Sequence, residues 1–132
     1  MIKFLIKEIK SKEGVVHFRR WRLLSLPWFS IYIHGIYKED LDEELHDHPW
    51  DIFTMILYGG YYEQTKRKVV LRKPFNCKYS EGHKPHKIKE LYKPVTYSLA
   101  IVGKRKRNWG YHMENGWWMD HKSYRKQKNE QT

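Results

Sequence analysis

The sequence lacks several features on which whole classes of protein depend. Its 132 residues contain a single cysteine, Cys77, which excludes an internal disulfide and favours a reducing compartment. Apolar runs long enough to cross a bilayer are missing, so we expect no membrane partner. The opening stretch MIKFLIKEIKSKEG interrupts its apolar positions with Lys and Glu, unlike a secretory signal. These features predict a cytoplasmic protein.

Negative charge is scarce in the second half of the chain. Residues 1–60 carry 8 basic and 9 acidic side chains, a net charge of −1, whereas residues 61–132 carry 18 and 6, a net of +12. A one-sided basic field attracts anions such as phosphates, nucleotides, carboxylates or nucleic acid. Lysines that keep exposed strands soluble would give the same excess, so both interpretations stay open.

Helical periodicity is weak, and most of the chain is typical of short strands with turns between them. Residues 1–9 fit a strand or a short helix, Gly59-Gly60 predicts a bend, and Asn115-Gly116 predicts a hairpin turn. We therefore predict one all-β domain, a small antiparallel β-barrel or double-sheet jelly roll, with a core at about 15–122 and a polar basic tail at 123–132. The expected strands are 17–24, 29–37, 51–63, 68–75, 86–92, 95–103, 107–113 and 117–119.

Two histidines in the stretch HDHPWD stand just before an apolar segment. In a strand, His46 and His48 would share one face while Asp47 points to the other. Neighbouring inward imidazoles are costly unless something satisfies them, and a divalent metal does so because neutral imidazole is its commonest protein ligand. The stretch EGHKPHKIKE offers His86 and His83 as a third ligand.

An alternative interpretation of the same stretch is a turn without metal. Asp51 would then cap exposed backbone amides, and His46 would hydrogen-bond a neighbour. The residues alone leave both interpretations open.

These motifs resemble those of cupins. The first cupin motif has two histidines one residue apart, a carboxylate and then a glycine after an apolar strand. Here these positions correspond to His46, His48, either Asp51 or no residue, and Gly59. The second, a Pro/Gly turn followed by a histidine, ends here at His86. Residues 31–124 resemble more narrowly a group of small single-domain cupins of bacteria and phages with an HDHPWDF-like stretch, which implies a fold and a site but no reaction.

The resemblance implies a divalent metal (Fe, Ni, Mn or Zn) on His46, His48 and His86, with His46 and His48 also catalytic. Metal cupins usually add a Glu four or five residues after the second histidine, where this chain has Ile52 and Phe53. The alternatives for a fourth ligand are Asp51, Glu63 and His34.

Aromatic and basic side chains around such a site are candidates for binding the substrate. Aromatic rings would stack on a planar or sugar-like ligand, and guanidinium groups would bind carboxylate or phosphate. The alternative is that aromatic residues fill the core and that a basic turn is merely solvated. The candidates are Trp50, Tyr58, Tyr61, Arg72, Arg105, Arg107 and Tyr111.

The sequence thus predicts a metal-binding cupin that acts as an enzyme, by oxygenase- or isomerase-type chemistry, on a small anionic substrate such as a nucleotide, sugar phosphate or carboxylate. A metal-free sugar isomerase that uses His46 or His48 as general base is also compatible. A different class is a non-catalytic module that binds an anionic ligand or nucleic acid through the basic C-terminal half. Cupins commonly pair through their sheets, and the number of aromatic residues allows a homodimer.

Overall fold

The structure is a computed structural model that describes residues 5–42 and 44–130. Strands dominate the described part of the chain, and one helix follows them. In chain order the elements are β1 (Leu5–Lys10), β2 (Val16–Ser25), β3 (Phe29–Ile36), β4 (Leu45–His46), β5 (Ile52–Tyr58), β6 (Tyr61–Gln64), β7 (Val69–Arg72), β8 (Cys77–Ser80), β9 (Lys87–Leu91), β10 (Thr96–Gly103), β11 (Gly110–His112), β12 (Trp118–Asp120) and α1 (His121–Glu130).

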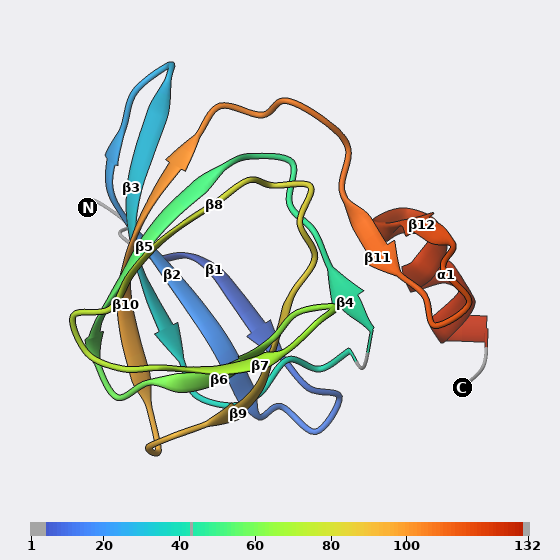
Figure 1. The fold of residues 1–132 in the computed structure, drawn as a ribbon, viewed down its shortest axis with the longest axis horizontal. Helices are drawn as coiled ribbons and strands as arrows, with labels where there is room; N and C mark the ends of the chain where they lie inside the picture. Colours follow the sequence, from blue (N-terminus) through green and yellow to red (C-terminus); the bar gives the residue numbers. More distant parts are fainter. Residues whose placement is uncertain (1–4, 43, 131–132) are drawn as a thin grey trace.

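The strands form three antiparallel sheets. A six-stranded sheet has the order β1-β2-β3-β10-β5-β8, and two three-stranded sheets have the orders β7-β6-β9 and β12-β11-β4. The six-stranded sheet curves over β7-β6-β9, whereas β11, β12 and α1 lie to one side (Figure 1). An isolated bridge between His46 and His86 connects β4 to the segment just before β9. The prediction of one all-β domain of the jelly-roll type is confirmed.

The predicted bend at Gly59-Gly60 is the point where the chain passes from one sheet to another. β5 belongs to the six-stranded sheet and β6 to β7-β6-β9, so the run expected at 51–63 becomes two strands. Gly59 has a φ of 86°, and a Cβ there would lie 2.1 Å from the carbonyl oxygen of Val95. Only glycine fits this corner, because both the backbone conformation and the space exclude a side chain.

The inward face of the six-stranded sheet carries polar groups as well as the core. Every second residue of β10 from Thr96 to Val102 is buried, as period-two alternation requires. A core cluster of Ile36, Ile56 and Tyr61 fills one part of the interior. The polar side chains of His34, Glu63 and Ser98 are also buried in the interior of the barrel. Buried polar side chains require hydrogen-bond partners, and a few convergent polar groups are also typical of ligand pockets.

Some elements differ from the sequence-based expectations. β4 and β8 were not expected. For the segment at 1–9, where a strand or a short helix was expected, the described part forms strand β1, and residues 1–4 lie outside the described residues. The hairpin turn at Asn115-Gly116 is confirmed, with Gly116 at a φ of 88° between β11 and β12.

Residues 121–130, most of which were expected to form a polar tail, form helix α1. The ring of buried Tyr124 stacks on Tyr111 at 3.7 Å, and its hydroxyl donates to Glu44. One well-placed aromatic side chain thus docks an otherwise polar helix. No helix in the described ranges is long and apolar enough to cross a membrane.

Candidate metal centre

The three histidines predicted as ligands come together where β4 meets the segment before β9. His46 ends β4, His48 follows two residues later, and His86 immediately precedes β9. The backbone N–H of His46 donates to the carbonyl of His86 at 2.9 Å, and the reverse bond is 2.8 Å. The N–H of His48 donates to the carbonyl of Gly82 at 2.8 Å. Backbone pairing therefore fixes the positions of all three imidazoles.

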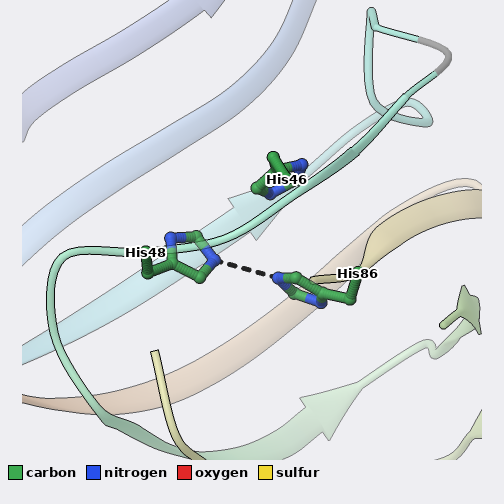
Figure 2. Close-up of side chains that lie close together, drawn as sticks. All are labelled: His46, His48 and His86. Atoms are coloured by element: carbon green, nitrogen blue, oxygen red, sulfur yellow. Dashed lines mark hydrogen bonds between the residues drawn. The ribbon is translucent and has the colours of Figure 1, made fainter. Parts of the chain in front are cut away.

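The imidazole rings point toward one another (Figure 2). One ligand nitrogen from each of His46, His48 and His86 lies within 4.8 Å of the others, and the Nε2 atoms of His48 and His86 are 2.9 Å apart. An ion with metal–nitrogen bonds of about 2.1 Å needs neighbouring ligand atoms roughly 3.0–3.4 Å apart. The His48–His86 pair already has about this spacing, so the donor set is suited to a divalent metal. Three ligands leave coordination positions for other molecules.

Glu63 stands behind His86 and orients it. The Oε2 atom of Glu63, a residue that is only 3% exposed, lies 2.8 Å from Nδ1 of His86. Its Oε1 atom accepts from Arg72 Nη2 at 2.9 Å and from Lys78 Nζ at 2.6 Å. Metal-ligating histidines usually donate their other N–H to such a carboxylate, which fixes the tautomer. Here Nδ1–H of His86 faces Glu63, and Nε2 faces the centre of the cluster.

The environment keeps the imidazoles of His46 and His48 neutral. Burial, and then the neighbouring His86, lower the pKa of His46 to about 4 and lower the pKa of His48 well below its ordinary value. For Glu63, burial alone would raise the pKa, but its interactions with His86 and Lys78 outweigh that effect and hold it well below its usual range. Neutral imidazoles backed by a charged carboxylate are the protonation states that metal binding requires.

Asp47 points away from the two histidines, as strand alternation predicts. Its buried carboxylate accepts from the N–H of Gly110 at 2.7 Å and from Trp118 Nε1 at 2.9 Å, and it lies 3.1 Å from Nε2 of His112. The side chain between the two ligands therefore ties β4 to β11 and β12.

The structure brings none of the three alternatives for a fourth ligand into the histidine cluster within the described residues. Asp51 caps the backbone N–H of Gly82 at 2.8 Å and pairs with Lys106 at 2.7 Å, interactions that lower its pKa to about 2. Glu63 binds His86 from behind, and His34 accepts from Arg20 Nε at 3.0 Å. The amide cap expected of Asp51 in the turn interpretation is therefore present beside the histidine cluster.

The other candidate third ligand, His83, is exposed and lies 3.6 Å from Glu81 instead of entering the cluster.

Two of the predicted substrate-binding residues lie beside the histidine cluster. The ring of Trp50 stacks on His48 at 6.4 Å, and the ring of Tyr111 lies 6.2 Å from His46. Tyr61 is part of the core cluster, and Tyr58 is half exposed at the far end of β5.

The three arginines predicted to bind anions do not converge on the cluster. Arg72 is paired with Glu63, and Arg107 lies 3.7 Å from Asp51. Arg105 is exposed in the loop between β10 and β11.

Sequence reasoning missed Arg20 and Lys78, which both point into the barrel. The signal for Arg20 was present in HFRRWRLL, because alternation that places Phe18 inward also places Arg20 inward. Lys78 gave no such signal, since β8 was not expected as a strand.

Comparison with known proteins supports the fold assignment. No family model matches the chain, and no curated protein matches it. Among solved structures, a cupin-2 domain protein from Rhodospirillum rubrum is similar with a TM-score of 0.66 and 16% identity, covering 85% of this chain and 78% of that one.

Two further solved structures have the same fold. An iron(II) form of HppE has a TM-score of 0.60 and 16% identity over 73% of this chain, and the match spans 55% of HppE. A proposed mannose-6-phosphate isomerase from Ralstonia eutropha JMP134 has a TM-score of 0.60 and 15% identity, covering 66% and 84% of the two chains. The chain therefore has the cupin fold, with a histidine cluster that is able to hold a divalent metal.

Proposed function

We propose that this chain is a metal-dependent cupin enzyme acting on a small anionic substrate. The observation that carries the proposal is the convergence of His46, His48 and His86. Buried Glu63 supports it, because its carboxylate is hydrogen-bonded to Nδ1 of His86. A divalent metal (Fe, Ni, Mn or Zn) held there would polarise a bound carbonyl or, as iron, support oxygen chemistry. We also assign the chain to the small HDHPWDF-type cupins, on the motifs in residues 46–51.

Each residue has a distinct part in this proposal. His46, His48 and His86 bind the metal through ring nitrogens that lie close together. Glu63 keeps the Nδ1 proton of His86 in place and so presents Nε2 to the ion. The indole of Trp50 forms a wall beside His48 that restricts the orientation of a planar ligand.

Metal-free base catalysis is less well supported by the same geometry. A general base is most effective when its pKa lies near the working pH, and burial holds the pKa of His46 at about 4. Such an imidazole is neutral at pH 7 but a weak proton acceptor, which suits a ligand better than a base.

A non-catalytic module that binds nucleic acid is also less favoured. Two cations of the basic loop between β10 and β11, Lys106 and Arg107, face Asp51. The loop therefore offers less free positive charge than its sequence suggests.

Metal content measured by mass spectrometry tests the proposal. Wild-type protein should retain about one equivalent of metal, and a His46→Ala/His48→Ala variant should retain none. The control is His83→Ala, because His83 is an exposed histidine outside the cluster and its loss should change nothing. Equal metal content in the wild type and the double variant would refute the metal centre.

The reaction class is tested on a defined mixture of sugar phosphates, nucleotides and small carboxylates. Oxygenase chemistry yields products heavier than their substrates by added oxygen, whereas isomerisation leaves the mass unchanged. Either product should form with the metal-loaded wild type and disappear with His48→Ala. Metal-bound protein that alters no member of the mixture would favour the binding module instead.

A further inference from the structure

Arg20 places a cation inside the barrel, and no carboxylate among the described residues pairs with it. It lies on β2 in register with His34, and its guanidinium carbon is 4.8 Å from the centre of the Tyr32 ring and 5.6 Å from that of Trp50. Within the described ranges no carboxylate oxygen comes within ion-pair distance of it. A partly buried charge that lacks a counter-ion is costly, and an anionic ligand would offset that cost.

His34 holds the guanidinium in a fixed orientation. Arg20 Nε donates to His34 Nε2 at 3.0 Å, and burial together with the charge of Arg20 lowers the pKa of His34 to about 3. His34 is therefore a neutral acceptor, fixed on β3 beside Arg20. The bond uses Nε and leaves the two terminal nitrogens of the fork, which are the pair suited to bind an oxyanion bidentately.

Trp50 connects Arg20 to the histidine cluster. Its indole is approached by the guanidinium of Arg20 and stacks on the ring of His48 with an interplanar angle of 10°. The indole Nε1–H is buried and has no acceptor in the part of the chain described. Two hydrogen-bond donors thus lack an oxygen acceptor next to His48, and an oxyanion would satisfy both.

We propose that Arg20 binds the carboxylate or phosphate group of the substrate, with Trp50 Nε1 donating to the same ligand, while the remainder of the substrate reaches the metal at His46, His48 and His86. This inference rests on the proposed function and specifies its substrate class. The inference assigns anion binding to Arg20 instead of Arg72, which is paired with Glu63 at 2.9 Å, or Arg107. The Nη1 atom of Arg107 lies 3.7 Å from Asp51 and has no hydrogen-bond partner among the described residues, but its charge faces that carboxylate.

Isothermal titration of metal-loaded protein with glycolate, inorganic phosphate and glycolamide tests the proposal. Glycolate and phosphate carry the two candidate anionic groups, and glycolamide has the shape of glycolate without its charge. We expect the wild type to bind at least one anion and not glycolamide. Arg20→Met should weaken that binding by roughly tenfold to a hundredfold, because hydrogen bonds to charged groups have that effect.

The matched control is Arg19→Met. Arg19 is the neighbouring residue on the opposite face of β2, where it pairs with Glu8 at 2.6 Å, so its loss should leave anion binding unchanged. Arg20→Lys keeps the charge but not the fork, and its affinity should lie between those of the wild type and Arg20→Met. This variant also provides the test if Arg20→Met does not fold, as judged by circular dichroism.

The outcomes separate this inference from the proposed function. Metal content is measured on the same samples. If metal loading is normal and the wild type, Arg20→Met and Arg20→Lys bind anions equally, the proposed role of Arg20 is overturned while the metal centre stands. The same holds if the metal-loaded wild type binds neither anion. Absence of metal together with anion binding that depends on Arg20 supports Arg20 and overturns the metal centre.

Discussion

At the scale of single residues, Glu63 determines how His86 is presented to a metal. Its carboxylate meets Nδ1 of His86 at 2.8 Å and is held from the other side by Arg72 and Lys78. Replacing Glu63 by Gln keeps the volume but removes the charge that favours the Nδ1–H tautomer of His86. We expect metal affinity to fall roughly tenfold to a hundredfold, measured by competition with a chromogenic chelator.

The control for this prediction is Glu81→Gln, which neutralises an exposed carboxylate next to His83. Its metal affinity should equal that of the wild type. If Glu63→Gln binds metal as tightly as the wild type, Glu63 does not orient His86.

The buried imidazoles also predict how the stability of the metal-free protein depends on pH. The pKa of His46 is about 4 in the folded protein and about 6.5 when the chain unfolds, so the unfolded chain binds more protons between these values. The free energy of unfolding should therefore rise from pH 4 to pH 6.5, and His46 alone should contribute up to about 3 kcal/mol. Urea denaturation of the wild type and His46→Gln at several pH values measures this difference.

The His46→Gln variant should show a shallower rise over this range, because His48 and His34 still titrate. His83→Gln, which removes an exposed histidine, should follow the wild-type curve. Parallel curves for the wild type and His46→Gln would contradict the prediction.

At the scale of elements, β4 is too short to hold its own position, and Asp47 ties it to the neighbouring strands. The strand has two residues, and the Asp47 carboxylate that follows it bonds the Gly110 amide and the Trp118 indole. Asp47→Ala would leave these buried donors without an acceptor, at a cost of about 3 kcal/mol in the free energy of unfolding. Asp47→Asn keeps one acceptor oxygen and should cost less.

Urea denaturation of both variants measures this effect, with Glu81→Ala as an exposed control. Since β4 carries His46, Asp47→Ala should also weaken metal binding. An Asp47→Ala variant as stable as the wild type would show that β4 is held by other contacts.

Most of the strands could be predicted from the sequence because their residues alternate or are continuously apolar. The eight-residue strand β10 and the corner at Gly59-Gly60 follow from local pattern alone. β4 and β8 could not be predicted this way, since two- and four-residue strands acquire their identity only from their partners. Helix α1 was missed for a similar reason, because its docking depends on the distant contact of Tyr124 with Tyr111.

At the scale of the whole molecule, the candidate site depends on pairings between distant parts of the chain. His46 and His48 are recognisable from their spacing, and His86 follows from its place in a second motif. The contacts of Glu63 with His86 and of Arg20 with His34 depend on sheet register, which local sequence does not encode. The ligands were therefore predictable from motifs, whereas the residues that support them and balance their charge required the structure.

The same long-range arrangement predicts that metal binding stabilises the entire fold. His46 belongs to the sheet β12-β11-β4, and His86 leads into β9 of the sheet β7-β6-β9, so one ion would cross-link two sheets. A ligand that binds only the folded state at a hundred times its Kd adds about 2.7 kcal/mol, which raises Tm by about 10 °C in a chain of this length. Thermal unfolding with Zn, Ni, Mn or anaerobic Fe(II) should show this shift for the wild type and His83→Ala, and none for His46→Ala/His48→Ala. A Tm that stays constant with all four metals would mean that the histidine cluster serves the fold without an ion.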